Sequence, residues 1–432
     1  MNNTKRKSPI SWVPTAYFAM GLPFVVLNMV TVLMFKGLEV DDKLITFWTS
    51  LILLPWTLKP LWSPFLELFR TKKFFVIVTQ LITGVTFGLV AFALNLSHFF
   101  SISIALLAIV AFSGATHDIA CDGVYMSELS NEDQAKFIGW QGAFYNIAKI
   151  LATGGLVYLA GYFIELNADA GLLTANKRAW MIILLILSVT MILLGIYHLF
   201  ALPSTQSASS RKTLRSNKEV MKELGQVLMD FFRKTHITYY ICFIILYRFA
   251  EGFVMKIVPL FLKADREMGG LGLNEKEIGL YYGTYGAAAF VLGSLLAGYY
   301  IARRGLKKTI FSLCCIFNLP FMVYALFAYF QPESGWIICS GIVFEYFGYG
   351  FGFVGLSLFM MQQVAPGKHQ MAHYAFASGI MNLGVMLPGM VSGYLSDLLG
   401  YRNFFIYVLI ATIPAFLITY FIPFTYDDSK NK

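Results

Sequence analysis

Charged side chains are scarce in this 432-residue chain. Asp, Glu, Lys and Arg together make up 13% of the residues, about half the share found in soluble domains. Apolar residues make up 57% of the chain, and the mean hydropathy is +0.65. This composition excludes a soluble globular protein and indicates a protein that crosses a membrane several times.

Catalytic and nucleotide-binding motifs are also missing. The sequence contains no phosphate-binding loop, no HExxH pattern and no GxSxG pattern. Its five cysteines fall in apolar stretches and lack the spacing of metal ligands or disulfides. We therefore expect no enzymatic activity, no cofactor and no metal, and transport would draw on an ion gradient.

Hydropathy divides the chain into twelve apolar stretches, each long enough to cross a bilayer. They are residues 12–35, 44–66, 74–94, 100–125, 136–163, 179–201, 237–262, 277–301, 309–330, 336–362, 371–394 and 403–424. The first is too long for a signal-peptide core and lacks a clear cleavage site, so we expect it to be retained. An even number of spans places both termini on one side of the membrane.

Lysine and arginine are distributed unequally between the two sides. Segments on the side of the termini carry 21 of these residues, against 8 on the other side. The positive-inside rule therefore places both termini in the cytoplasm. Because the net charge of +9 follows this loop pattern, we expect no binding to nucleic acid.

The longest polar interruption divides the chain into two halves. Residues 203–236 are rich in serine and then basic, and Lys218–Arg233 could form an amphipathic helix on the inner membrane surface. We predict a bundle of six helices in residues 1–202, a cytoplasmic linker in 203–236 and a second bundle in 237–432.

Internal repeats support this division. Residues 36–48 match residues 269–281, with Gly, Leu, Lys and Ile recurring at an offset of 233. A second pattern, a glycine followed four positions later by an acidic residue, recurs four times at matched spacing. Ser63 stands in place of the glycine in one copy, and Ala302 stands in place of the acid in another. The four stretches are 63–67, 161–165, 298–302 and 393–397. They resemble the loop signature of the major facilitator superfamily. The resemblance implies an all-α membrane protein with twelve transmembrane helices in two pseudo-symmetric six-helix bundles.

Span seven carries three charges within its apolar sequence. Arg248 lies about 18 Å and Glu251 about 22 Å along the helix from its polar end, near the middle of the bilayer. A charge at this depth costs at least ~2.5–3.5 kcal/mol and should face a partner or a wet cavity. Arg248 and Glu251 are three residues apart and share a helix face. They are either a buried pair that fixes helix packing or part of a transport path, and Lys256 lies further along.

Other spans also contain buried polar groups. Lys59 either bonds carbonyls freed by nearby prolines or extends toward the membrane surface. Asp118 and Asp122 lie four apart on span four. Asp118 is a candidate proton or cation site, whereas Asp122 is expected to pair with the basic loop after span two. Lys149 lies about 20 Å from the inner end of span five, too deep to reach the surface easily.

Five motifs resemble those of the AmpG-type muropeptide permeases within the superfamily. They are FAMGLPF (18–24), LKPLWSP (58–64), THDIACDG (116–123), YRFAEGFVM (247–255) and FEYFGYGFG (344–352). Members of this branch import anhydro-muropeptides, the sugar-peptides of recycled cell wall, with protons through the inner membrane. The eukaryotic acetyl-CoA transporters and some siderophore permeases are similar too. The resemblance therefore implies roles for the residues that occupy these motifs.

We assign the candidate residues to three groups. Proton coupling falls to Glu251, Asp118 and Glu345. Substrate binding falls to Arg248, Lys149, Lys256, Tyr145, Asn146, Tyr247 and Tyr346. Gating or a structural charge relay falls to Asp122, Glu67, Arg70, Lys72, Lys73 and Lys59.

The sequence thus predicts a monomeric, proton-coupled importer in the bacterial inner membrane, with a small sugar-peptide as substrate. Three alternatives remain open. The first is the same kind of carrier with another cargo, such as an oligosaccharide, a siderophore or a drug expelled by antiport. The others are a membrane-embedded enzyme and a sensor that transports nothing.

Overall fold

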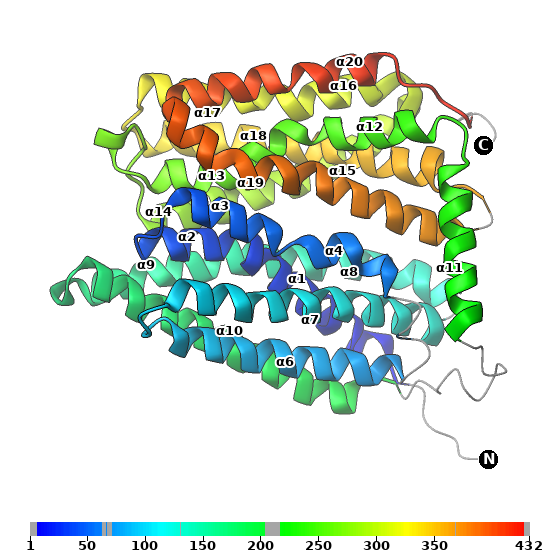
Figure 1. The fold of residues 1–432 in the computed structure, drawn as a ribbon, viewed down its shortest axis with the longest axis horizontal. Coiled ribbons are helices and arrows are strands. Elements are labelled where there is room, and N and C mark those ends of the chain that lie inside the picture. The colour runs from blue at the N-terminus through cyan, green and yellow to red at the C-terminus, as the bar shows by residue number, and fades with distance from the viewer. Residues whose placement is uncertain are drawn as a thin grey trace.

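A computed structural model describes residues 7–62, 66, 71–129, 131–203, 217–367 and 369–426, and all regular structure among them is helical. Figure 1 shows two layers of helices, α1 to α10 in one and α12 to α20 in the other. Both chain ends and α11 (Asn217–Phe232) lie on the same side of the molecule. We term this side the terminal end and the opposite side the distal end.

The first layer, the N-terminal bundle, spans the six predicted stretches before the linker. Its helices are α1 (Val13–Val25), α2 (Thr31–Gly37), α3 (Asp42–Leu51), α4 (Leu54–Leu58), α6 (Lys72–Ala93), α7 (Phe99–Glu128), α8 (Asn131–Ile150), α9 (Val157–Leu166) and α10 (Leu172–Ala201). Residues 26–30 and 151–156 form π-helical turns that join α1 to α2 and α8 to α9.

The second layer, the C-terminal bundle, follows the same plan. Its helices are α12 (Ile237–Tyr247), α13 (Phe249–Lys263), α14 (Glu275–Ile278), α15 (Ala287–Arg304), α16 (Leu306–Asn318), α17 (Met322–Phe330), α18 (Gly335–Phe359), α19 (Gln370–Ala411) and α20 (Ile413–Tyr420). A π-helical stretch at 279–286 joins α14 to α15, as the turn at 151–156 joins α8 to α9 in the first layer.

The twelve predicted spans all correspond to helical structure in the described residues. Within the described parts of the chain, nine segments are long and apolar enough to cross a membrane as they stand. One of them contains two spans, because Gly400 adopts φ 69° and ends one helix before the next begins. Residues 42–62 and 237–263 supply the remaining two spans, each divided by a short irregularity.

The two bundles approach each other closely away from the terminal end. At Gly283, a methyl group in place of the hydrogen would lie 2.0 Å from the Thr153 carbonyl oxygen of the other bundle. Only glycine permits this contact between two helix backbones. The Thr153 hydroxyl also donates to the Gly283 carbonyl at 3.3 Å.

Candidate functional site

A cavity of about 440 Å³ lies between the two bundles. Its walls come from α1, α4, α7 and α8 on one side and from α13, α15, α18 and α19 on the other. Nine of the residues selected from the sequence line it: Lys59, Asp118, Tyr145, Asn146, Lys149, Arg248, Glu251, Glu345 and Tyr346. The fold therefore brings together charged groups from five separate spans.

The N-terminal wall contains a carboxylate with a partial set of partners. The Trp56 indole nitrogen donates to Asp118 Oδ2 at 2.8 Å, and Lys59 Nζ lies 3.8 Å from the same oxygen. The other oxygen, Oδ1, is buried and has no hydrogen-bond partner in the described part of the chain. Asp118 can therefore still accept a hydrogen bond from a substrate or take up a proton.

The C-terminal wall contains the Arg248–Glu251 pair. Arg248 sits at the irregularity between α12 and α13, and its Nε and one terminal nitrogen each lie 2.5 Å from a different oxygen of Glu251. Both side chains are buried. Two parallel hydrogen bonds between a guanidinium and a carboxylate make a strong, directional pair. The predicted pairing is thus present, at the edge of the cavity.

Lys149 reaches from α8 to aromatic rings of the opposite bundle. Its ammonium nitrogen lies 4.2 Å from the ring centre of Phe290, 5.6 Å from that of Tyr349 and 5.8 Å from that of Tyr346. These distances are those of cation–π interactions. Within the described residues it makes no ion pair, so its charge is available to an anionic group in the cavity.

Glu345 is the second carboxylate of the C-terminal wall. It is 4% exposed, and the Tyr324 hydroxyl donates to its Oε2 at 2.8 Å. The neighbouring Tyr346 packs edge-on against Tyr282, with ring centres 4.9 Å apart. On the facing wall, Tyr145 and Asn146 line the cavity beside Lys149. The site thus combines three carboxylates and three cations with an aromatic surface.

Two residues assigned to substrate binding do not line the cavity. Lys256 is 1% exposed, and its ammonium donates to the Asn28 carbonyl at 3.2 Å and to the carbonyl and hydroxyl oxygens of Thr49 at 3.3 Å. The Tyr247 hydroxyl donates to the Gly352 carbonyl at 2.9 Å inside the C-terminal bundle. Both were selected because they lie in the same apolar span as Arg248, but their side chains are buried in the packed interior.

Of the residues assigned to gating, Lys59 lines the cavity, whereas Asp122, Lys72 and Lys73 lie toward the terminal end. Asp122 accepts a hydrogen bond from the Tyr17 hydroxyl at 2.8 Å. Lys72 donates to the Gly123 carbonyl at 3.2 Å and Lys73 to the Leu202 carbonyl at 2.9 Å. Glu67 and Arg70 lie outside the described residues. The predicted contact between Asp122 and the basic loop after span two therefore stays a prediction.

Several cavity residues were not selected from the sequence. They are Asn28, Trp56, Phe290, Ser378 and Asn382, among others. Asn28 interrupts an apolar run, and Ser378 and Asn382 lie four apart on one helix, so each carried a weak signal. Phe290 carried none, because it is one of 40 phenylalanines in a membrane protein.

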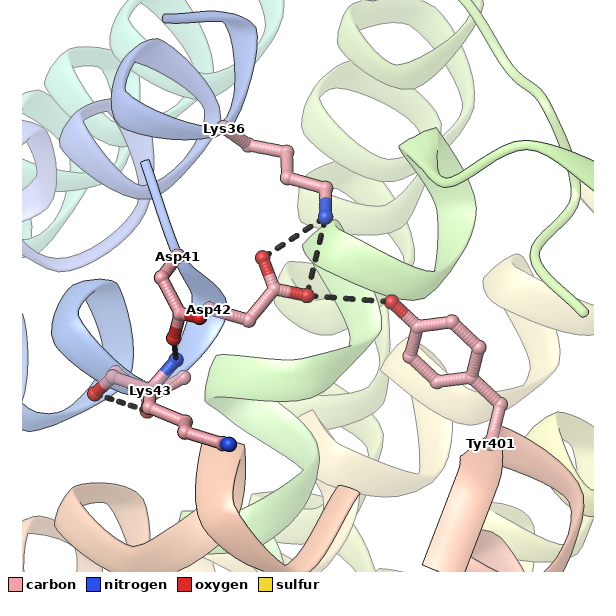
Figure 2. A network of polar contacts seen from close by, with 6 residues as sticks. Lys36, Asp41, Asp42, Lys43 and Tyr401 are labelled. Carbon is pink, nitrogen blue, oxygen red and sulfur yellow. Dashed lines mark hydrogen bonds and ion pairs between the residues drawn. The ribbon is translucent and has the colours of Figure 1, made fainter. Parts of the chain in front are cut away.

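Polar contacts at the distal end link the two bundles (Figure 2). The Lys36 ammonium donates to both oxygens of Asp42, at 2.8 and 3.1 Å, and the Tyr401 hydroxyl of the other bundle lies 3.4 Å from the same carboxylate. Lys43 pairs with Asp397 at 2.6 Å. Among the described residues, the recorded hydrogen bonds and ion pairs between the two bundles all lie at the distal end or between the distal end and the cavity.

Comparison with known families agrees with this architecture. The sequence matches the family model of the Major Facilitator Superfamily over residues 15–365 and again over 240–432. The chain belongs to this superfamily. It is therefore a multi-pass membrane transporter for a small molecule and not an enzyme.

Relatives of this transporter span most of its length. A protein of Rickettsia bellii, named putative transporter AmpG 1, is 24% identical over 85% of this chain and 87% of its own. The anhydromuropeptide permease of Escherichia coli K12 is 21% identical over 93% of this chain and 77% of its own. The resemblance to this branch is thus confirmed at the level of named relatives.

Solved structures of other transporters share its fold. A D-xylose–proton symporter superposes with a TM-score of 0.72 at 12% identity, covering 96% of this chain and 97% of its own. The nucleoside transporter NupG gives a TM-score of 0.71 at 14% identity, covering 96% and 99%. At such identities the likeness establishes the twelve-helix architecture and leaves the cargo open.

Proposed function

We propose that this transporter imports anhydro-muropeptides together with protons across the bacterial inner membrane. The cavity between the bundles carries the proposal, because it places beside aromatic rings the Lys149 cation and an Asp118 oxygen, neither of which has an ionic or hydrogen-bond partner in the described part of the chain. A sugar-peptide presents carboxylates, amides and sugar faces to its binding site. The relatives named as AmpG transporters and as an anhydromuropeptide permease support this choice of cargo.

Each part of the cargo has a counterpart in the cavity. Lys149 can bind a peptide carboxylate by a charge-assisted hydrogen bond, since it has no carboxylate partner among the described residues. Asp118 Oδ1 can accept from an amide or hydroxyl. Trp56, Tyr145 and Tyr346 offer surfaces for sugar rings.

Three buried carboxylates are candidates to carry the coupled proton: Glu251, Asp118 and Glu345. Glu251 is our first choice because its partner Arg248 would lose its counter-ion on protonation. The guanidinium would then be free to bind a substrate carboxylate, which links proton and substrate at one residue pair.

We also propose that both termini face the cytoplasm, as the basic loops indicate. The distal end, where the polar contacts link the bundles, then faces the periplasm. The described conformation is accordingly closed to the outside. Alternating access requires these contacts to break in each cycle.

Uptake by right-side-out membrane vesicles tests the function. Vesicles containing the transporter should accumulate a labelled anhydro-muropeptide when the outside is acidic, and should lose accumulation when a protonophore collapses the gradient. Xylose, a nucleoside and a siderophore serve as alternative cargoes. Gradient-driven accumulation of one of these instead of the muropeptide would replace the proposed substrate.

A further inference from the structure

A second cavity lies at the terminal end, remote from the transport site. It measures about 310 Å³ and lies between the end of α11 and the start of α19. Its described lining is Asp230, Arg233, Lys234, Pro366, Gly367, His369 and His373. One arginine, one lysine and two imidazoles therefore face a single carboxylate.

The existing contacts leave this positive charge largely uncompensated. The Lys234 ammonium donates to the carbonyls of Val364 and Pro366, both at 2.6 Å, and these neutral groups hold the ammonium in place without cancelling its charge. Burial lowers the pKa of Lys234, so an anion beside it would favour the charged form. Asp230 lies 3.7 Å from His369 Nε2.

A buried imidazole of this cavity has one nitrogen without a hydrogen-bond partner among the described residues. His373 is 2% exposed, and its Nε2 lies 3.2 Å from the Val227 carbonyl, to which it donates. Its other nitrogen, Nδ1, is buried and has no partner within the described ranges. A bound group that hydrogen-bonds to Nδ1 would satisfy it, and a protonated oxygen on a phosphate is such a group.

The start of α19 also favours an anion. The first turn of α19, which begins at Gln370, lies at this cavity, because His369 and His373 both line it. The dipole of a helix favours an anion near its N-terminus. Arg233 adds a planar guanidinium, suited to phosphate oxygens.

We propose that this cavity binds a phosphate group, either of an anionic phospholipid headgroup or of a soluble phosphate compound. The neighbouring surface favours the lipid. Met229 and Phe232, at the end of α11, are 52% and 58% exposed and present apolar side chains beside the basic residues. Apolar contacts next to cations are typical of helices that lie on a membrane surface. A bound phosphate would join α11 to the first turn of α19.

Binding to the full-length purified transporter tests the proposal. One arm compares the binding of phosphatidylglycerol with that of phosphatidylcholine by native mass spectrometry. The other arm measures the binding of inorganic phosphate by calorimetry. Arg233→Gln and, separately, His369→Gln should weaken binding about tenfold, the order expected for one charge-assisted hydrogen bond. Arg303→Gln is the control, because Arg303 stacks on Tyr299 at 4.2 Å outside the cavity.

The two arms identify the source of the phosphate. Preferential binding of phosphatidylglycerol supports a lipid headgroup, and saturable binding of inorganic phosphate alone supports a soluble ligand. Binding in neither arm overturns the proposal. Equal weakening by Arg233→Gln and Arg303→Gln would also overturn it, since general surface charge would then explain the binding.

Discussion

The Lys43 ammonium of the N-terminal bundle lies 2.6 Å from the Asp397 carboxylate of the C-terminal bundle. The hydrogen bond to Asp397 raises the pKa of Lys43, so this lysine stays charged near neutral pH. Lys276 of the C-terminal bundle pairs in the same way with Glu165 of the N-terminal bundle. Lys43 and Lys276 are equivalent in the internal repeat, as are Glu165 and Asp397. The two halves are thus joined at the distal end by two ion pairs that occupy equivalent positions in the internal repeat.

These paired bridges should favour the distally closed state. Each involves exposed groups and contributes roughly 0.2–1 kcal/mol, so each single Lys→Gln variant should shift the balance at most severalfold. The double variant Lys43→Gln/Lys276→Gln should shift this equilibrium by about the product of the two single-variant factors. Spin labels at Asp169 and Met268, one in each bundle, would measure the longer distance between the distal ends of the bundles when that end opens. Arg178→Gln, which removes a cation not involved in these bridges, should leave the distances unchanged; an equal response there would exclude a specific role.

Lys256 and Lys263 should respond oppositely to loss of charge. The Lys256 ammonium is held by neutral oxygens, whereas Lys263 pairs with Glu275. Replacing a buried charge that lacks a counter-ion by a residue of similar volume removes a desolvation cost of several kcal/mol. We therefore expect Lys256→Met to raise the melting temperature by several degrees and Lys263→Met to lower it. Thermal unfolding in one detergent checks both, and destabilisation by Lys256→Met would refute the argument.

Glu251→Gln should separate substrate exchange from proton coupling. The amide keeps a hydrogen bond to Arg248 but cannot take up a proton. The variant should therefore fold and exchange substrate across proteoliposomes, yet lose accumulation driven by a pH gradient. Counterflow and gradient-driven uptake are measured side by side. Undiminished accumulation would remove Glu251 from the coupling step and direct the same test to Asp118 and Glu345.

Lys149→Gln should weaken cargo binding. It removes both the cation that faces three aromatic rings and the charge available to a substrate carboxylate. Loss of one charge-assisted contact predicts about a tenfold higher Kd. Lys149→Arg should recover most of the affinity, since guanidinium groups also stack on aromatic rings. Failure of arginine to rescue would show that the compact ammonium itself is required.

Cysteine labelling tests the orientation. In a background with Cys242 and Cys315 replaced by serine, Asp169→Cys should react with an impermeant reagent added outside sealed right-side-out cells. Ser207→Cys, in the basic linker, should react only after permeabilisation. The reverse pattern would invert the proposed topology and with it the direction of the closed end.

The sequence by itself determined the number of spans, their division into two bundles and the residues able to carry charge into the membrane. Span length and repeat offsets are local properties, so they are readable without the fold. Both partners of each distal ion pair lie within the internal repeats that the sequence shows. No local sequence pattern, however, indicates that Lys43 contacts Asp397.

Only the tertiary structure decided which charges share the cavity. Lys149 and Lys256 looked alike in sequence, as single cations deep in apolar spans. The packing of the two bundles places Lys149 beside Phe290 in the cavity and Lys256 against backbone oxygens of α3 and the turn after α1. The difference arises because a helix face is defined by its neighbours, and the neighbours of these two lysines come from segments more than 130 residues away.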